Sequence, residues 1–440
     1  MTAFVTRHPR LFTGIQVMIR YISSTTFSPK DHYGIDILPL SFFENADYPG
    51  SPPIECLVLY KKKTSLPAAR ESFLETIRHY NLFSSRLIMI DENRFALLYC
   101  TDGFQYMVLP RLDADAAHIS IDDVRHMMRH VKTLPGEPLF AVTIIPVRDG
   151  LLGGISCSHA IGDAVSLMLF LYAWGCIHYG NSFSKPSTQR LFSGNPVDFD
   201  TFDSVFAPPV SDLHETIRKR AENSQETTRY HRREYFSDER LAKMKNGATS
   251  ENENYRLSNN QIINAVLLKK YHNSIMPGTD QIRLRIPINL RYIHPDVDPL
   301  YIGNAVFSTV IGFSRAEINR MSVYRIACRL KEAIAKMRNE HYVRSIACLS
   351  KFGIRYRGDI FKTLPPYDPD TDILAANLTH VNDLESLGLG DDVGRILYMG
   401  STMQTSFTML KEKHNRLFAE IRSRYPLESP KTIHGTAEVP

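Results

Sequence analysis

The chain has 440 residues, of which 43% are hydrophobic and 22% are charged, a composition that indicates an ordered globular protein and excludes a disordered one. Its length exceeds what one ordinary hydrophobic core supports, so we expect two domains. The net charge of +5 is small and spread along the chain, and the three lysines at 61–63 are typical of a solvated strand end. We therefore expect no nucleic-acid partner.

Cysteine spacing and apolar runs exclude further classes. The six cysteines form neither a CxxC pair nor a zinc-type spacing with histidine, so we expect reduced thiols, no metal site and a cytoplasmic protein. No apolar run reaches the roughly 18 to 20 residues that a membrane-spanning helix requires. The segment 1–30 lacks acidic residues, as transit peptides do, but an ordinary strand at 14–22 explains it better.

In the first part of the chain, apolar spacing predicts a helix at 65–80, and a second helix is expected at 121–134. Strands are predicted at 86–90, 95–100, 139–147 and 150–158. The last two strands form a hairpin that closes at an aspartate-glycine turn. His159 then lies at the exit of an interior strand, and Asp163 opens the next helix.

The segment 181–230 is polar and punctuated by proline, which indicates a crossover linker between a first domain, 1–180, and a second domain, 231–440. After the linker, Ser258 and Gln261 form a capping-box pattern ahead of an apolar helix. Strands are predicted at 281–290, 303–313 and within 395–410, and a long helix at 316–340. Strands and helices mix irregularly in both halves, which predicts an α/β fold.

The segment 153–175, GGISCSHAIGDAVSLMLFLYAWG, carries the strongest candidate for chemistry. His159 and Asp163 stand four residues apart, where an apolar strand turns into an apolar helix. The pair could hold a metal, but no third ligand of matching pattern follows. The segment also lacks the GxSxG frame of serine hydrolases and a phosphate-binding glycine loop with lysine. Two interpretations remain: a histidine base with a carboxylate nearby for support, and a core histidine bonded to the backbone.

Residues 158–174, SHAIGDAVSLMLFLYAW, resemble the HxxxD segment of the BAHD acyltransferases, in the superfamily of chloramphenicol acetyltransferase and condensation domains. Further segments resemble the other landmarks of the family, in the order of the family: LPLSFFENADY (38–48), FLETIRHYNLFSSRL (73–87), LSNNQIINAVLLKKY (257–271), IPINLRYIHPDVDPLYIGNAV (286–306) and NLTHVNDLESLGLG (377–390). The chain is identified as a member of this family, divergent from its plant members. The resemblance covers nearly the whole chain.

This resemblance implies two chloramphenicol-acetyltransferase-like domains, each a mixed β-sheet flanked by helices, around a central solvent channel. It implies acyl transfer from acyl-CoA to a hydroxyl or amine of a small-molecule acceptor. His159 is then the general base, and the reaction needs no covalent intermediate, bound cofactor or metal. Asp163 pairs with an arginine and supports the histidine loop. Thr379 resembles a family threonine that steadies the oxyanion, with an ordinary strand threonine as the alternative.

Three further residues are candidates for substrate contacts. Ser258 and the free amides at its helix start suit a phosphate of coenzyme A, although such a serine is more often only a helix cap. Tyr301 and Asn304 are expected to line the channel, and the alternative is a tight turn built on the permissive backbone of Gly303.

The sequence departs from the family pattern at two places. Ala164 replaces the glycine that follows the motif aspartate. The DFGWG block is reduced to SLGLG at 386–390, without the aspartate that in the family is a partner of a conserved arginine. That arginine maps to Arg291, so we expect Arg291 to bind another carboxylate, Asp383 or Asp391, or to remain solvated.

Two rival functions remain. One takes the acyl group from a carrier-protein thioester, as condensation domains do, but the doubled histidine of those domains is absent, since Ser158 precedes His159. The other is a catalytically silent relative that binds a small molecule, which the intact His159 and Asp163 disfavour. We expect a monomeric, cytoplasmic acyltransferase of secondary metabolism.

Overall fold

The computed structural model describes residues 37–40, 53–61, 64–91, 94–100, 103–187, 230–249, 256–293, 297–336, 368, 370–379, 389, 393–400, 405–411 and 416–427. The strands are β1 (Ile37–Pro39), β2 (Ile54–Tyr60), β3 (Ser85–Asp91), β4 (Arg94–Tyr99), β5 (Phe104–Val108), β6 (Phe140–Pro146), β7 (Leu151–Cys157), β8 (Tyr230–Phe236), β9 (Gln281–Asn289), β10 (Val306–Ser314), β11 (Asp372–Asn377), β12 (Val393–Gly400), β13 (Ser406–Lys411) and β14 (Leu417–Ser423). The α-helices are α3 (Leu66–His79), α4 (Ile121–Val124), α5 (Ala164–His178), α7 (Asp238–Thr249), α8 (Asn259–Ile275), α9 (Arg315–Arg320) and α10 (Val323–Lys336), and the 3₁₀-helices are η1 (Asn81–Ser84), η2 (Ala116–His118), η3 (Arg125–Met127) and η4 (Leu290–Tyr292).

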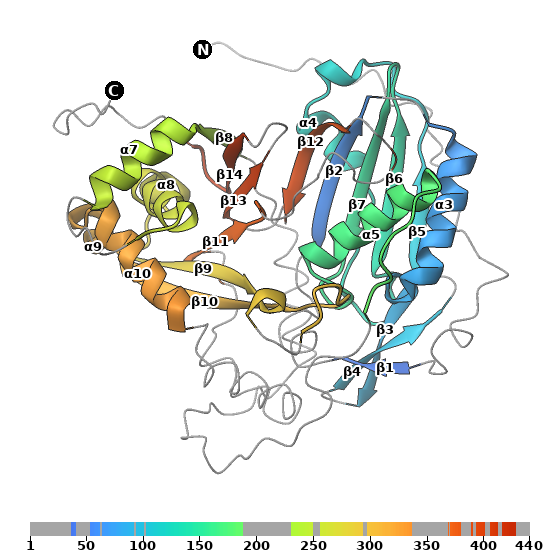
Figure 1. Ribbon diagram of the computed structural model, residues 1–440, viewed down its shortest axis with the longest axis horizontal. Helices are drawn as coiled ribbons and strands as arrows, with labels where there is room; N and C mark the ends of the chain where they lie inside the picture. The colour runs from blue at the N-terminus through green and yellow to red at the C-terminus, as the bar shows by residue number, and fades with distance from the viewer. Residues whose placement is uncertain are drawn as a thin grey trace, which may run out of the picture.

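The first sheet has five strands in the order β12-β2-β7-β6-β5 and is antiparallel except for the parallel pair of β5 and β6. Helices α3 and α5 lie side by side over one of its faces (Figure 1). Phe73 of α3, Phe140 of β6, and Phe170 and Trp174 of α5 pack in one buried aromatic cluster. This packing holds α5 in place relative to the strands, and so fixes where the helix begins.

The second sheet has six strands in the order β10-β9-β11-β13-β14-β8, and α7, α8 and α10 lie on one of its faces (Figure 1). Alternate residues of its strands, such as Ile282, Leu284 and Phe407, pack against these helices in a second hydrophobic core. The residues between them point to the opposite face and include buried charges. There, Asp372 accepts a hydrogen bond from Arg285 Nη2 at 3.1 Å. A third, small sheet has the order β1-β4-β3.

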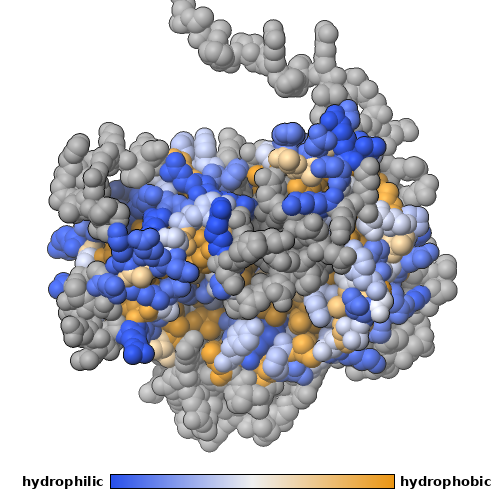
Figure 2. Space-filling model, turned by 45° about the horizontal axis from the view of Figure 1, so that its top comes forward, coloured by the Kyte–Doolittle hydropathy of each residue, from blue (hydrophilic) through white to orange (hydrophobic). Residues whose placement is uncertain are grey.

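The two halves of the chain share a sheet and a hydrophobic core. Although β12 belongs to the second half, it pairs antiparallel with β2 in the first sheet. Leu410 and Phe418, from β13 and β14, are buried in the core that α3 and α5 form with the first sheet. On the face drawn in Figure 2, hydrophilic residues cover most of the flanks, whereas hydrophobic residues gather toward the middle. The chain is therefore a mixed α/β protein of two closely joined halves, and the domain limits at 180 and 231 stay a prediction.

Several predicted elements are confirmed. The helix at 65–80 is α3, and its N-cap Ser65 accepts a hydrogen bond from the Ala68 amide at 3.4 Å. The predicted hairpin is the antiparallel pair of β6 and β7, and the Val147 amide closes its turn by donating to the Gly150 carbonyl oxygen at 3.1 Å. The predicted strand at 14–22 and most of the linker 181–230 lie outside the described residues, as do the residues from 428 onward.

The helix expected at 121–134 is wrong beyond its first turns. The chain forms α4 and η3 and leaves helical structure at Met128, whose backbone is extended. The reason lies in the sheet beneath it. The amides of Arg129 and Val131 donate to the side chains of Thr143 and Ser156, at 3.0 and 3.1 Å, instead of to helix carbonyl groups.

The helix expected at 316–340 is two helices, α9 and α10, within the described residues that end at 336. The break falls at Met321 and Ser322. The Ser322 hydroxyl accepts a hydrogen bond from the Arg325 amide at 3.2 Å, so this serine starts a new helix as an N-cap.

Candidate active site

His159 lies in the loop 158–163, between the end of β7 and the start of α5, as the sequence predicted. β7 is paired on both sides, with β2 and β6, so the end of the strand is firmly held. Beyond the strand, the Ser158 amide donates to the Leu139 carbonyl oxygen at 2.8 Å. The Ile161 amide then donates to the Ser158 carbonyl oxygen at 3.2 Å. These bonds make the loop a tight turn around His159.

Asp163 closes the loop and caps α5. Its Oδ1 accepts from the Ser166 amide at 2.9 Å, which satisfies a free donor of the first helical turn. Its Oδ2 accepts from Arg291 Nη1 at 2.6 Å and from the Ala305 amide at 2.9 Å. Burial alone would raise the pKa of this carboxyl, but the Arg291 charge and these hydrogen bonds hold the pKa below its usual value. Asp163 is therefore a buried carboxylate at the junction of the two halves.

Arg291 lies in η4, directly after β9, and its side chain is fully buried. Besides Asp163, it donates to the carbonyl oxygens of Tyr301, at 2.8 Å, and Gly303, at 3.2 Å. Nη1 also donates to Asn289 Oδ1 at 3.2 Å. Gly303 has a φ of 140°, which L side chains rarely adopt, so glycine permits the turn that offers these carbonyl groups. The turn 301–305 and η4 together form a socket for one guanidinium group.

The predicted partner of Arg291 was therefore wrong. Asp383 and Asp391 lie outside the described residues, and the arginine is neither solvated nor in need of another carboxylate, because it binds Asp163. The resemblance implied an arginine for Asp163, and the departures called for a carboxylate for Arg291. Asp163 and Arg291 are each other's partner, and both residues were already named as candidates in the sequence.

Ser166 is a member of this network that sequence reasoning missed. Its hydroxyl donates to the Gly303 carbonyl oxygen at 2.7 Å and accepts from Arg291 Nη2 at 3.0 Å. The Gly303 amide in turn donates to Ser166 Oγ at 3.1 Å. The available signal was a lone serine in the first turn of an otherwise apolar helix.

The electrostatic surroundings of His159 favour the neutral imidazole. Burial lowers the pKa of His159 to about 4, and the charge of Asp163 only partly offsets this effect. At neutral pH the ring is therefore uncharged and has a lone pair that can accept a proton. A partly buried neutral histidine on a fixed loop is suited to general-base chemistry.

Thr379 lies just after β11, at the end of the second sheet where the neighbouring parallel strand β9 also ends. β9 and β11 are parallel neighbours, so Asn377 at the end of β11 lies on the same edge as Asn289, the contact of Arg291. The Thr379 hydroxyl donates to Asn377 Oδ1 at 2.6 Å, and the Thr379 amide donates to the same oxygen at 3.1 Å. Leu378 packs against the core of the first half, which places this strand end at the junction of the two halves.

The remaining predicted site residues are in well-defined positions. Ser258 caps α8, and the capping box with Gln261 is confirmed, since each residue binds the backbone amide of the other. Tyr301 and Asn304 are fully buried beside Arg291, and Asn304 Oδ1 accepts from the Val306 amide at 3.1 Å. A contact of these three residues with substrate stays a prediction.

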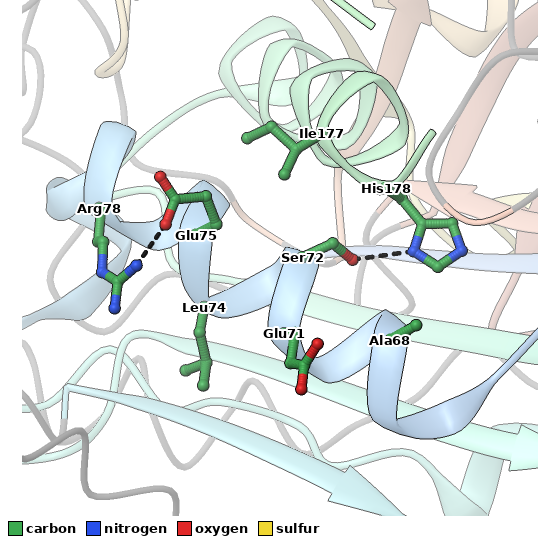
Figure 3. A pocket seen from close by; sticks show the side chains of 8 residues that line it. All are labelled: Ala68, Glu71, Ser72, Leu74, Glu75, Arg78, Ile177 and His178. Atoms are coloured by element: carbon green, nitrogen blue, oxygen red, sulfur yellow. Dashed lines mark hydrogen bonds and ion pairs between the residues drawn. The ribbon is translucent and has the colours of Figure 1, made fainter. Parts of the chain in front are cut away.

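A surface cleft of about 500 Å³ lies elsewhere, between α3 and the end of α5 (Figure 3). Its His178 is bonded to Ser72 Oγ at 3.0 Å and to Thr64 Oγ1 at 2.8 Å. The 15 residues of α5 span roughly 22 Å, and His178 ends the helix that Asp163 begins. The cleft is therefore at the opposite end of α5 from the His159 loop, and its histidine serves to join two helices.

Two further properties concern the described residues only. They contain no group of three or more histidine, cysteine, aspartate or glutamate side chains placed to hold a metal ion. Within the same ranges, each helix is too short or too polar to cross a lipid bilayer.

The sequence and the fold both resemble those of known proteins. A family model described as the Transferase family matches residues 17–355, well over half of the chain. The chain belongs to this family, that of the BAHD-like acyltransferases. An uncharacterized acetyltransferase of Arabidopsis thaliana is 21% identical over 227 residues, 49% of this chain and 48% of the relative. The chain thus matches about half the length of this curated relative.

Solved structures share the fold of this family member. The TRI101 protein of F. sporotrichioides, in complex with coenzyme A and T-2, has 14% identity and a TM-score of 0.64, covering 88% of this chain and 95% of that one. Vinorine synthase has 14% identity and a TM-score of 0.64, covering 93% and 94%. The first condensation domain of the CDA synthetase has 11% identity and a TM-score of 0.51, covering 86% of each chain. The expected two-domain architecture of chloramphenicol-acetyltransferase type is confirmed.

Proposed function

We propose that the protein transfers an acyl group from acyl-CoA to a hydroxyl or amine of a small-molecule acceptor. One observation carries this proposal. His159, neutral at pH 7, stands on a tight strand-exit loop whose far end is tied down by the buried pair of Asp163 and Arg291. Membership of the BAHD-like family supports the same class of reaction.

In the proposed reaction, the His159 imidazole takes the proton of the acceptor hydroxyl or amine as the acceptor attacks the thioester carbonyl carbon. The carbonyl oxygen of the tetrahedral intermediate then carries the negative charge. The intermediate collapses with cleavage of the carbon–sulfur bond, and the proton passes from His159 to the departing thiolate. The products are an ester or amide and free coenzyme A. A thioester is already activated, so no acyl-enzyme is required.

Asp163 has a supporting role in this proposal, because both of its oxygens are engaged. Oδ1 caps α5, and Oδ2 holds Arg291 and the Ala305 amide. The carboxylate therefore fixes the loop that carries the base and takes no proton itself. When the base is already held near its reactive position, the entropic cost of orienting it in the transition state is small.

Thr379 is the proposed donor to the oxyanion. Its position at the junction of the two halves supports this role. In the protein without substrate, its hydroxyl donates to Asn377 Oδ1, so the hydroxyl must exchange that bond for one to the oxyanion. A donor of this kind stabilises charge that develops only in the transition state.

The proposed donor is acyl-CoA, and the complex of TRI101, a protein of the same fold, with coenzyme A supports this choice. The exposed start of α8, capped by Ser258, is the proposed contact for one of its phosphates. Because the side chains of Tyr301 and Asn304 are fully buried, we propose that these residues support the wall of the channel from behind its surface. We further propose that the protein acts as a cytoplasmic monomer in secondary metabolism.

The direct test is a thiol-release assay with the purified protein, acetyl-CoA and longer acyl-CoA donors, and a panel of hydroxyl and amine acceptors. Acceptor-dependent release of coenzyme A that His159→Ala abolishes supports the proposal. A parallel reaction with acyl thioesters on a phosphopantetheine carrier protein tests the condensation-type alternative. Turnover with the carrier-protein thioester, but not with acyl-CoA, would show that the acyl donor is a carrier protein. No turnover with either donor, together with tight binding of an acceptor, identifies a silent relative.

A further inference from the structure

Residues 129–133 form a strap that follows β7 toward its end, where the His159 loop begins. The strap lies on the face opposite α3 and α5, because Met128, which precedes it, packs with Leu57 and Leu152 in a separate core on that face. Gly154 of β7 permits this close approach: a Cβ on Gly154 would lie 2.8 Å from Met128 Cγ. The strap is thus seated tightly on β7.

Side chains of the strands hold the backbone of the strap. The Arg129 amide donates to Thr143 Oγ1 of β6 at 3.0 Å, and the Val131 amide donates to Ser156 Oγ of β7 at 3.1 Å. In addition, Arg129 Nε donates to Gln105 Oε1 of β5 at 2.8 Å. The strap is therefore fastened across three neighbouring strands before it reaches the loop.

At its end, the strap contacts the loop through two buried hydroxyl groups. Thr133 Oγ1 and Ser158 Oγ are 2.9 Å apart and share a hydrogen bond. Ser158 Oγ also accepts from the Ala160 amide at 3.1 Å. The Ser158 hydroxyl thus binds the residue after His159 while its own backbone precedes His159. The Ser158 side chain therefore links the backbone on both sides of His159, and the hydrogen bond to Thr133 fixes the position of the Ser158 hydroxyl.

We infer that Thr133 and Ser158 are positioning residues for His159, an inference that rests on the proposed role of His159 as the general base. Together with Asp163 and Arg291, they hold the loop at both ends and from both faces of the first sheet. Neither hydroxyl reacts with substrate. They restrict the position of the imidazole relative to the acceptor proton, and small displacements of a catalytic group lower rates strongly.

Three variants of two threonines separate positioning from general stability. Thr133→Val removes the hydroxyl and keeps the shape, whereas Thr133→Ser keeps the hydroxyl. Thr143→Val is the matched control, because Thr143 is a buried threonine that fastens the same strap through Arg129 without touching the loop. We expect Thr133→Val to lower kcat about 10- to 100-fold with both KM values little changed. Thr133→Ser should retain most of the activity, and Thr143→Val should lower the melting temperature with little effect on kcat.

The inference is overturned if Thr133→Val keeps the wild-type kcat, or if Thr133→Ser and Thr143→Val are impaired as strongly as Thr133→Val. Should Thr133→Val not fold, Ser158→Ala removes the same bond from the other side, together with the bond from the Ala160 amide, and is expected to lower kcat at least as much. His159→Ala is assayed in parallel. An inactive wild-type protein, or an active His159→Ala variant, contradicts the proposed function itself. A wild-type rate that requires His159 but not the Thr133 hydroxyl contradicts only this inference.

Discussion

The carboxylate of Asp163 and the guanidinium of Arg291 meet at 2.6 Å, although 128 positions separate them in the chain. Asp163 begins α5 in the first half, and Arg291 follows β9 in the second. Both side chains are buried, so neither charge has water as an alternative partner. The ion pair links the loop of the proposed base directly to the second sheet.

The first prediction concerns this carboxylate. Asp163→Asn keeps the shape and can still cap α5, but it leaves the buried Arg291 charge without its counter-charge. We expect a loss of about 3 kcal/mol in the free energy of unfolding, together with a lower rate. Denaturant unfolding and steady-state kinetics measure the two effects. Asp238→Asn, at the exposed start of α7, is the control and should change stability by less than about 0.5 kcal/mol. Unchanged stability with a large loss of rate would instead assign Asp163 to the chemistry.

The second prediction tests the pair by a double-mutant cycle. Arg291→Met removes the charge and also the donors to the Tyr301 and Gly303 carbonyl oxygens. We expect each single variant to be strongly destabilised. The double variant with Asp163→Asn should lose clearly less than the sum of the two, because the partner charge left uncompensated in each single variant is gone. Additive losses of unfolding free energy would show that the two side chains do not stabilise each other.

The third prediction is a pH profile. Burial lowers the pKa of His159 from its ordinary value of 6.5 to about 4, so the imidazole becomes protonated only at a lower pH. Because only the neutral ring accepts a proton, kcat/KM for a hydroxyl acceptor, which does not itself titrate in this range, should stay nearly constant from pH 8 to about 5 and fall as the pH drops through about 4. Circular dichroism at each pH separates protonation from unfolding. An acid limb with a midpoint near 6.5 in a folded protein contradicts the expectation.

The fourth prediction concerns the acyl donor. If the capped start of α8 meets a phosphate, Ser258→Glu introduces a repulsive charge there and should raise the KM for acyl-CoA more than it lowers kcat. An acyl-pantetheine without the nucleotide should be a much poorer donor. Ser65→Glu, at the N-cap of α3, provides the matched control and should leave the KM unchanged. Equal use of both thioesters, with no effect of Ser258→Glu, favours a carrier-protein donor.

Local patterns predicted the elements around the site well. The exit of β7, the Asp163 cap of α5 and the capping box of Ser258 each depend on a few neighbouring residues, and all three are present. Long-range pairing was harder to predict. β12 joins the first sheet from the far end of the chain, and no local pattern encodes its partner β2. The strap at 129–133 was expected to be part of a helix at 121–134. Its backbone amides instead donate hydrogen bonds to the side chains of Thr143 and Ser156, which are polar residues of neighbouring strands.

The most direct measurement is the activity of His159→Ala in the thiol-release assay, with circular dichroism and a thermal melt to verify its fold. His159 is the proposed base and forms no part of the buried ion pair, so the variant should remain folded. We expect its activity to fall by roughly two to four orders of magnitude, the usual contribution of a positioned general base. A folded variant that retains more than half of the wild-type activity would remove His159 from the mechanism.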